Sequence, residues 1–430
     1  MTGLANRRQA DADLQEMTAA NAKAQTDFCV MQVDIDRFKT INDALGHAAG
    51  DFVLTTASAI FKDCAGPKSR CYRIGGDEFL IVWAGVYTTA QAEAMAERLI
   101  RLIKAPMDFK GHRCNVGASI GIALGRDTGF DAMQAAINAD LALYQVKRSG
   151  RGTYSFFTED LADLTAQTKA LSDRLVQAID QKKFQPFYQP QFDARTRVLR
   201  GVEVLCRWHE PDMGWISPGD FLEVADDLGL VGTIDDILFE KVAEDLETLA
   251  ARGLSLPKVS FNVTADRLLR SGLAHDLSSR IGMHTTIALE LLESMSLDNP
   301  PESVRWAIDE LAAHGIEIEI DDFGSDRASL AGLMAINPQA MKIDRSIVIP
   351  IVESVRHLDL VKKIIDIGAA LNVEVVAEGV ETEEHALRLA SLGCDVLQGY
   401  GLARPMPFAD LIVHCEAYET GTREASRSIA

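Results

Sequence analysis

The stretch FYQPQFDARTRVLRGVEV, residues 187–204, holds two strand-like segments joined by the turn DARTR. Parallel neighbours need a crossover connection of about a dozen residues or more, so a turn this short can join only antiparallel strands. Downstream, strand-like segments alternate with helix-length segments, which is the pattern of parallel strands with helical crossovers. The second half therefore predicts a TIM-like β/α barrel whose first strand runs antiparallel to the second.

Polar residues recur near the ends of the strand-like segments in this half. Any one of them alone would ordinarily be a turn or helix-capping residue, and a lone lysine would be solvated. In β/α barrels, however, the functional groups gather at one mouth, so recurrence at eight strand ends indicates a site. The eight residues are Gln189, Glu203, Asn262, Glu290, Asp321, Lys342, Glu378 and Gln398.

The first half predicts a separate α/β domain, with helices near residues 7–24, 90–104 and 131–147 and a buried strand at 28–36. In CYRIGGDEFLIVW (71–83) the two glycines predict a hairpin turn between apolar strands. They do not explain the adjacent acids Asp77 and Glu78. Neighbouring carboxylates repel each other unless a cation or a substrate proton lies between them. This turn is therefore a candidate for chemistry.

The run from Thr158 to Lys183 is polar, rich in alanine and free of glycine and proline, which predicts a helical connector. We accordingly expect a first domain at 1–160, a connector helix at 161–182 and a second domain at 183–430.

The composition excludes several classes of protein. A net charge of −20 disfavours binding of a nucleic-acid polymer, although small anionic nucleotides remain possible where metal ions bridge the charges. The seven cysteines form no CxxC pair, which suits a reducing compartment without structural zinc. No apolar run approaches the roughly 20 residues that span a bilayer, and no signal peptide opens the chain. We expect a cytoplasmic chain without membrane contact.

The motifs resemble those of the tandem GGDEF–EAL proteins, which make and break cyclic di-GMP, over nearly the whole chain. GGDEF is intact at Gly75–Phe79, and DIDRFKTINDALGHAAGD at Asp34–Asp51 matches the diguanylate cyclase pattern. EVLCRW at Glu203–Trp208 is similar to the EAL signature, with valine in place of alanine. The resemblance implies a nucleotidyl-cyclase-like α/β domain followed by the barrel.

For the first half, the resemblance implies a GTP site. Asp34 and Asp77 would hold two Mg²⁺ or Mn²⁺ ions against the phosphates, and Glu78 would lie at the attacking hydroxyl. Such ions clamp phosphates and lower the pKa of the hydroxyl. Synthesis joins two GTP molecules on two facing domains, which implies a homodimer. The other GTP-binding positions would be Gly75 and Gly76 in the turn, Asn42 and Asp51 at the guanine edge, and Lys39, Lys147 and Arg151 at phosphates.

For the second half, the resemblance implies a cyclic di-GMP phosphodiesterase that yields pGpG. Oxygen-rich ligands favour two Mg²⁺ or Mn²⁺ ions over zinc. Lys342 would touch the attacking water, Glu378 would be a further ligand or would orient that water, and Glu293 would anchor the DDFG loop. The metal ligands would be Glu203, Asn262, Glu290, Asp321 and Asp322, and the substrate contacts Gln189, Arg207 and Gln398.

Four features depart from the family pattern. Leu292 replaces the usual threonine of E-x-T-E, and Asp326 replaces a glycine of the DDFG loop. The inhibitory R-x-x-D motif is absent, because Gly66–Ser69 reads GPKS. The opening MTGLANRR is similar to a longer family opening cut inside the motif. We therefore expect an upstream sensor region in the natural protein, which leaves its membrane anchoring open.

Two interpretations remain. In the first, the chain is a phosphodiesterase fused to a GGDEF domain that binds GTP and, in a bifunctional protein, also synthesises cyclic di-GMP. In the second, it is a catalytically silent receptor that binds cyclic di-GMP in the barrel. Degenerate receptors usually lose several ligand positions, and none is lost here, which favours the enzyme.

Overall fold

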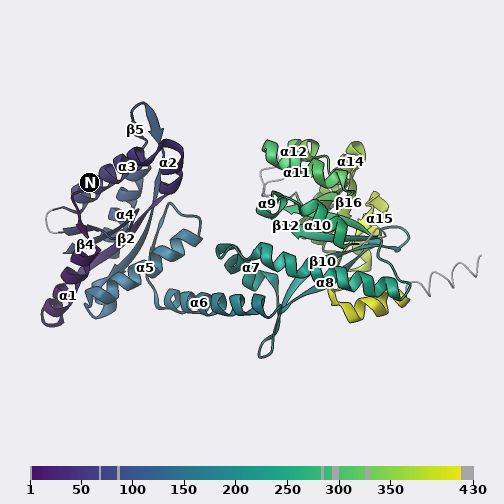
Figure 1. The fold of residues 1–430 in the computed structure, drawn as a ribbon, viewed down its shortest axis with the longest axis horizontal. Helices are drawn as coiled ribbons and strands as arrows, with labels where there is room; N and C mark the ends of the chain where they lie inside the picture. Colours follow the sequence, from purple (N-terminus) through teal and green to yellow (C-terminus); the bar gives the residue numbers. More distant parts are fainter. Residues whose placement is uncertain are drawn as a thin grey trace, which may run out of the picture. The chain divides into compact units, whose positions relative to one another are not determined.

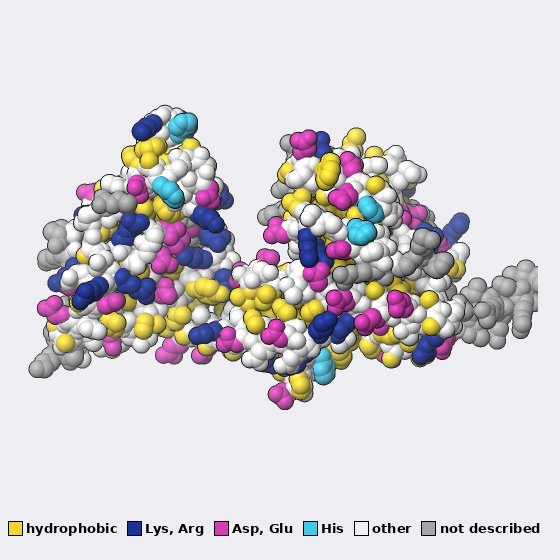
Figure 2. Space-filling model, viewed as in Figure 1, with side chains coloured by type: hydrophobic (Ala, Val, Ile, Leu, Met, Phe, Trp, Pro, Cys, Tyr) yellow, Lys and Arg dark blue, Asp and Glu magenta, His cyan; other side chains and the backbone are white. Residues whose placement is uncertain are grey.

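The computed structural model describes residues 2–66, 69–84, 88–281, 285–292, 300–324 and 330–417. The chain divides into two compact units, residues 1–170 and 171–430 (Figure 1). Among the described helices, none is long and apolar enough to cross a membrane. Acidic and basic side chains are intermixed over the described part of the face drawn in Figure 2.

The first unit is built on a six-stranded sheet with the order β1-β3-β4-β2-β7-β8. The central strand β2 (Phe28–Asp36) is buried along its whole length and pairs antiparallel with β4 (Glu78–Ala84) and β7 (Gly117–Leu124). The hairpin predicted at the two glycines is confirmed, because β3 (Ser69–Arg73) pairs antiparallel with β4. The smaller strands are β1 (Ala5–Asn6), β5 (Met107–Phe109), β6 (His112–Cys114) and β8 (Tyr154–Phe156).

Helices cover both faces of this sheet, which explains why β2 is buried on both sides. Alternate residues of β2 pack against α3 (His47–Ala65) and α4 (Thr89–Lys104) on one face. The other residues of β2 face α1 (Arg7–Ala24) and α5 (Ala132–Arg148). The short helix α2 (Phe38–Leu45) and the 3₁₀ turn η1 (Gly125–Thr128) lie in the connections.

The second unit contains a closed barrel of eight strands. Seven of them are parallel in a continuous series, and β9 closes the ring by pairing antiparallel with β10 and with β17. The predicted antiparallel first strand is therefore confirmed. In ring order the strands are β10 (Leu199–Glu210), β12 (Lys258–Val263), β13 (Thr286–Leu292), β14 (Glu317–Phe323), β15 (Ala340–Ile343), β16 (Glu374–Ala377), β17 (Val396–Leu397) and β9 (Phe184–Asp193).

The apolar core of this unit lies between the outer face of the barrel and the helices around it. The interior of the barrel is instead rich in polar side chains near its mouth. The outer elements are α7 (Pro218–Asp227), α8 (Val231–Ala251), α9 (Ala265–Leu268), α10 (Leu273–Arg280), α11 (Glu302–Ala313), α12 (Leu330–Ile336), α13 (Arg345–Val348), η3 (Ile349–Val352), α14 (Val355–Leu371) and α15 (Glu383–Leu392). Two short strands, β11 (Gly214–Ile216) and β18 (Met406–Pro407), extend the sheet.

The boundary between the units falls within one helix, α6 (Glu159–Asp180). Its later part belongs to the second unit, where Leu175 and Ala178 are fully buried against Phe184, Trp208 and Phe221. Arg174 of the same helix forms an ion pair with Glu210 at 3.3 Å. The C-terminal part of α6 is therefore an integral element of the barrel unit.

The end predicted for the second barrel strand was wrong. Glu203 was expected near the strand end, but β10 continues to Glu210. The extension is paired on both sides, because Trp208 lies opposite Phe184 of β9 and opposite Ile216 of β11. Burial of the aromatic rings in this extension explains why the strand does not end at the mouth.

Candidate active site

Lys342 on β15 is the centre of a buried cluster of carboxylates. Its Nζ lies 2.7 Å from Glu378 Oε1, 2.9 Å from Glu290 Oε2, 3.2 Å from Glu203 Oε2 and 3.5 Å from Asp321 Oδ1. Burial disfavours a charged lysine, but the four carboxylates outweigh that cost and hold the pKa of Lys342 well above its usual value. The side chain is therefore an ammonium at neutral pH.

Amide side chains orient Glu203 toward this lysine. Asn262 Nδ2 donates to Glu203 Oε1 at 2.9 Å, and Gln398 Nε2 donates to Glu203 Oε2 at 2.5 Å. Gln398 Nε2 also donates to Gln189 Oε1 at 3.2 Å. Burial alone would raise the pKa of Glu203, but Lys342 and the two amides together lower it. Glu203 is therefore held ionised.

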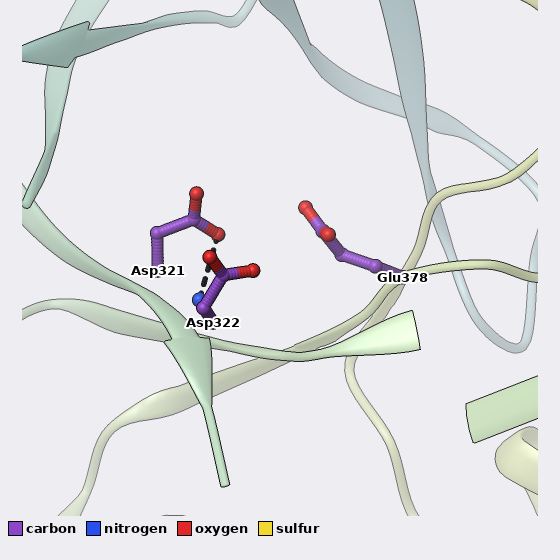
Figure 3. Close-up of side chains that lie close together, drawn as sticks. All are labelled: Asp321, Asp322 and Glu378. Carbon is purple, nitrogen blue, oxygen red and sulfur yellow. Dashed lines mark hydrogen bonds between the residues drawn. The ribbon is translucent and has the colours of Figure 1, made fainter. Parts of the chain in front are cut away.

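A local irregularity of β14 brings two consecutive aspartates to the site. Neighbouring residues of a regular strand point to opposite faces. Here the register shifts between Ile320 and Phe323, and Asp322 takes a left-handed backbone conformation with φ of 56°. Asp322 N donates to Asp321 Oδ1 at 2.9 Å (Figure 3). Both carboxylates can therefore face Glu378.

Glu378 completes a group of three acids with Asp321 and Asp322 (Figure 3). One carboxylate oxygen of each residue lies within 4.8 Å of the others. Burial raises the pKa of Glu378 to about 7 despite the attraction of Lys342. Burial and the charges of Asp321 and Asp344 raise the pKa of Asp322 to about 6. The arrangement concentrates negative charge that a cation would neutralise.

The donor atoms fit divalent cations. Glu290 Oε1 is buried without a hydrogen-bond partner among the described residues, and burial raises the pKa of Glu290 well above its usual value. A buried oxygen without a partner is costly, and a metal ion would supply one. The set of carboxylates plus the Asn262 amide consists of oxygen ligands, which Mg²⁺ and Mn²⁺ prefer. These residues can therefore hold such ions.

An apolar cavity of about 370 Å³ adjoins this cluster. Glu203 and Asn262 line it together with residues of α7 and α8. Asp235 of α8 also lines it, and its Oδ2 is buried without a hydrogen-bond partner among the described residues. Burial raises the pKa of Asp235 to about 7. The cavity therefore offers an unused acceptor to a ligand bound at the mouth.

A second group of polar residues lies at the end of β2 in the first unit. Lys147 Nζ lies 2.6 Å from Asp34 Oδ2. Ile35 N donates to the Asp77 carbonyl oxygen at 3.2 Å, which joins the glycine turn to the end of β2. Burial and the charge of Asp34 raise the pKa of Asp77. Two carboxylates and a lysine thus meet beside the turn, as a metal-and-phosphate site requires.

Asp36 holds the loop after α5 in place. Its Oδ1 accepts from Ser119 Oγ at 2.7 Å and its Oδ2 from Gly152 N at 3.1 Å. Arg151, just before Gly152, has a positive φ of 63° and an exposed side chain. Asp36 therefore fixes the loop that carries Arg151.

The helices α2 and α3 meet at Asn42. A Cβ at Gly50 would lie 2.1 Å from Asn42 Oδ1, so only glycine allows this close approach. Asp51 follows Gly50 with an exposed side chain, and Lys39 is exposed on α2.

Comparison with known families assigns both units. The family described as "EAL domain" matches residues 172–405, and "Diguanylate cyclase, GGDEF domain" matches residues 1–153. The chain belongs to the GGDEF–EAL family. Its EAL domain is the barrel unit, and its GGDEF domain is the first unit.

Several relatives align with almost the whole chain. "Bifunctional diguanylate cyclase/cyclic di-GMP phosphodiesterase MucR" of Pseudomonas aeruginosa is 32% identical over 96% of this chain and 60% of its own. "Cyclic di-GMP phosphodiesterase NbdA" of the same organism is 30% identical over 93% of this chain and 51% of its own. The chain thus spans about half to three fifths of the length of these relatives.

A solved structure resembles the EAL domain. "PaMucR Phosphodiesterase, c-di-GMP complex" has 30% sequence identity and a TM-score of 0.52, and the match covers 56% of this chain and 99% of that one.

The structure brings most of the expected EAL residues together, with two exceptions, Arg207 and Glu293. Arg207 lies beyond Glu203 on β10, where its guanidinium is 5.5 Å from the centroid of the Phe187 ring and donates to the Cys206 carbonyl oxygen at 2.7 Å. Glu293 and Asp326 lie outside the described residues, as do the side chain of Leu292 and two residues of the GPKS segment.

Sequence reasoning missed several residues of these sites. Gln191, fully buried, donates from Nε2 to Gln398 Oε1 at 2.9 Å. Its two-residue spacing from Gln189 could have revealed it, because both lie on one face of β9. Asp36 lies two residues from Asp34 on β2 and could have been identified in the same way. Asp235 carried no such signal, because a single acid near the start of a helix is common.

Proposed function

We propose that the EAL domain hydrolyses cyclic di-GMP to the linear dinucleotide pGpG. The observation that carries this proposal is the ammonium of Lys342 among four carboxylates, next to a buried oxygen of Glu290 that has no hydrogen-bond partner in the described part of the chain. Such a site favours cations and a polarised phosphodiester over an apolar ligand. The names of relatives aligned over nearly the whole chain support the same substrate.

The proposed ligands of two Mg²⁺ or Mn²⁺ ions are Glu203, Asn262, Glu290, Asp321 and Asp322. When bound, such ions polarise the phosphodiester and lower the pKa of water. Glu378, with a pKa raised to about 7, is matched to accept a proton from the attacking water near neutral pH. The water oxygen forms the new bond to phosphorus, and one 3′-oxygen of the cyclic dinucleotide leaves. Lys342 orients the water and is too strongly held as an ammonium to act as the base.

Substrate contacts are proposed for Gln189 and Gln398 at the mouth, and for Arg207 farther along β10. We add Asp235, because it lines the same cavity as Glu203 and Asn262 and its Oδ2 has no hydrogen-bond partner within the described ranges. The Watson–Crick edge of guanine presents N1–H and the 2-amino group, which are donors that a carboxylate can accept. Asp235 would therefore recognise one base of the substrate.

For the GGDEF domain we propose GTP binding, with Asp34 and Asp77 toward a metal ion and Lys147 toward phosphate. Synthesis of cyclic di-GMP by two facing copies is the second candidate activity. The motif Gly75–Phe79 is intact and Asp77 lies beside Asp34, which favours this activity over loss of function.

The test is incubation with cyclic di-GMP and Mn²⁺, followed by chromatography of the nucleotides. We expect pGpG from the wild type and none from Asp321→Asn. Binding of cyclic di-GMP without cleavage at any Mn²⁺ or Mg²⁺ concentration would favour the silent receptor instead.

A further inference from the structure

A second ion pair lies inside the barrel, one layer deeper than the carboxylate cluster. Lys258 Nζ of β12 bonds to Glu319 Oε1 of β14, and Ser260 Oγ donates to Glu319 Oε2 at 3.2 Å. Glu319 is fully buried, and Lys258 is 8% exposed. Two-residue periodicity places Lys258 and Ser260 on the inner face of β12 and Glu319 on the same face as Asp321.

The pair lies beside a proposed metal ligand. Glu319 of β14 and Glu290 of β13 occupy paired positions on neighbouring strands, and both are fully buried. Neighbouring strands are about 4.8 Å apart, so the two side chains are close within the barrel. Any net charge on the deeper pair therefore acts directly on Glu290.

Stability does not explain why the barrel retains these charges. Replacing a buried ion pair with well-packed apolar residues is often neutral or stabilising. Ala340, Val376 and Val396 form an apolar cluster in the same barrel, so apolar packing is available here. Moreover, a Cβ at Gly201 would lie 2.9 Å from Lys258 Cβ and 2.8 Å from the Lys258 carbonyl oxygen. The absence of a side chain at Gly201 therefore permits the close approach of β10 to β12 at residue 258.

The pair continues outward as a series of alternating charges. Lys258 Nζ lies 3.8 Å from Glu374 Oε2, and Arg200 binds Glu374 Oε1 at 2.5 Å at the exposed end of the series. The charge of Lys258 is therefore shared between Glu319 and Glu374, while Lys258 is the one cation that forms an ion pair with Glu319 among the described residues. Neutralisation of Glu319 depends on Lys258.

We propose that Lys258 and Glu319 are positioning residues that keep the layer beneath the metal site electrically neutral, so that Glu290 remains available to a divalent cation. This inference rests on the proposed metal-dependent function of the same site. Loss of Glu319 leaves the positive charge of Lys258 uncompensated beneath the ligands and weakens cation binding. Loss of Lys258 leaves a negative charge there and strengthens it.

The test measures Mn²⁺ binding by calorimetry, together with thermal unfolding, on the full chain without nucleotide. All proteins carry Asp34→Asn, so that the GGDEF site does not contribute. We expect Glu319→Gln to raise the half-saturating Mn²⁺ concentration roughly threefold to tenfold, and Lys258→Gln to lower it. The double variant Lys258→Gln/Glu319→Gln should return close to the background protein. Arg200→Gln, at the exposed end of the series, is the control and should leave the curve unchanged.

Opposite shifts from the two single variants identify a charge effect, because a packing defect would weaken binding in both. Unchanged metal curves with lowered unfolding temperatures, or a double variant as impaired as Glu319→Gln, would overturn the inference. If Glu319→Gln does not fold, a rise in the half-saturating concentration with Lys258→Gln would overturn it. A background protein whose Mn²⁺ binding is unaffected by Asp321→Asn would instead overturn the proposed function of the site.

Discussion

Asp235 Oδ2 is buried without a hydrogen-bond partner among the described residues, and the charge of Arg267 only partly offsets the effect of burial on the pKa of Asp235. Glu203, by contrast, is stabilised as a carboxylate by Lys342 and two amides. Burial of the Asp235 carboxylate therefore destabilises the fold, but the same oxygen could accept a hydrogen bond in a complex. A ligand that donates hydrogen bonds to it would recover part of that cost.

The destabilisation caused by burying ionised Asp235 should make the free energy of unfolding depend on pH. Burial raises its folded pKa from 3.8 to about 7, so the fold favours the protonated form. The contribution of protonated Asp235 to the free energy of unfolding is fully present below about pH 4 and is lost as the pH rises through about 7. We therefore expect Asp235→Asn to increase the free energy of unfolding at pH 8 by about 1–2 kcal/mol, and much less at pH 4.

Denaturant unfolding at both pH values measures this effect. Asp226→Asn, at an exposed position on α7, is the control and should show no such pH dependence. An equal effect of Asp235→Asn at pH 4 and pH 8 would contradict the interpretation.

The role of Asp235 in recognising guanine can be tested with cyclic di-IMP, which lacks the 2-amino groups. The wild type should bind cyclic di-GMP more tightly than cyclic di-IMP, because the amino group donates to Asp235. Asp235→Asn should lose roughly tenfold or more in affinity for cyclic di-GMP and less for cyclic di-IMP, which keeps the N1–H donor but lacks the amino group. Calorimetry with Ca²⁺ measures both affinities. Retained discrimination in the variant would refute the assignment.

At the scale of elements, α6 shows how a connector can be part of a folded unit. Leu175 is fully buried in the aromatic cluster of the EAL domain, whereas Leu164 of the same helix is 46% exposed. We expect Leu175→Ala to destabilise the EAL domain by about 2–4 kcal/mol and Leu164→Ala to cost less than about 0.5 kcal/mol. Thermal and denaturant unfolding measure both. Comparable decreases in the free energy of unfolding for the two variants would mean that Leu175 does not anchor α6 to the EAL domain.

The strands show what the sequence could predict and what it could not. A turn of five residues was enough to predict that β9 runs antiparallel, because chain length alone forbids a crossover. The approach of Asp322 to Asp321 and Glu378 was not predictable from alternation, because it depends on a bulge and a left-handed residue in β14. The extension of β10 to Glu210 was missed because its partners, β9 and β11, are set by tertiary packing.

For side chains inside the barrel, too, some features could be predicted from the sequence and others could not. Two-residue spacing could have identified Gln191 and Glu319, since each shares a strand face with a residue that was recognised. It could not show that Lys258 pairs with Glu319, because β12 and β14 are separated in the ring by β13. Contacts across the interior of a closed barrel depend on its curvature and are not encoded in any one strand.

At the scale of the whole molecule, synthesis from GTP would require two GGDEF domains to face each other. We therefore expect cyclic di-GMP synthesis per milligram of protein to rise with protein concentration, because assembly follows mass action. The assay uses Glu203→Ala, which should block hydrolysis, and the double variant with Asp77→Asn should abolish synthesis. Specific activity that does not vary over a roughly hundredfold range of concentration would contradict synthesis by a reversible dimer.

Cleavage of cyclic di-GMP by Lys342 and the acids around it is tested by comparing the wild type with Lys342→Ala. Formation of pGpG is measured by chromatography in Mn²⁺, and cyclic di-GMP binding is measured in Ca²⁺. Lys363→Ala, at an exposed position on α14, is the control. The account predicts that Lys342→Ala binds the nucleotide but cleaves it at least roughly a hundredfold more slowly, the scale of losing one group that acts on the reacting water. Cleavage by Lys342→Ala at the wild-type rate would contradict it.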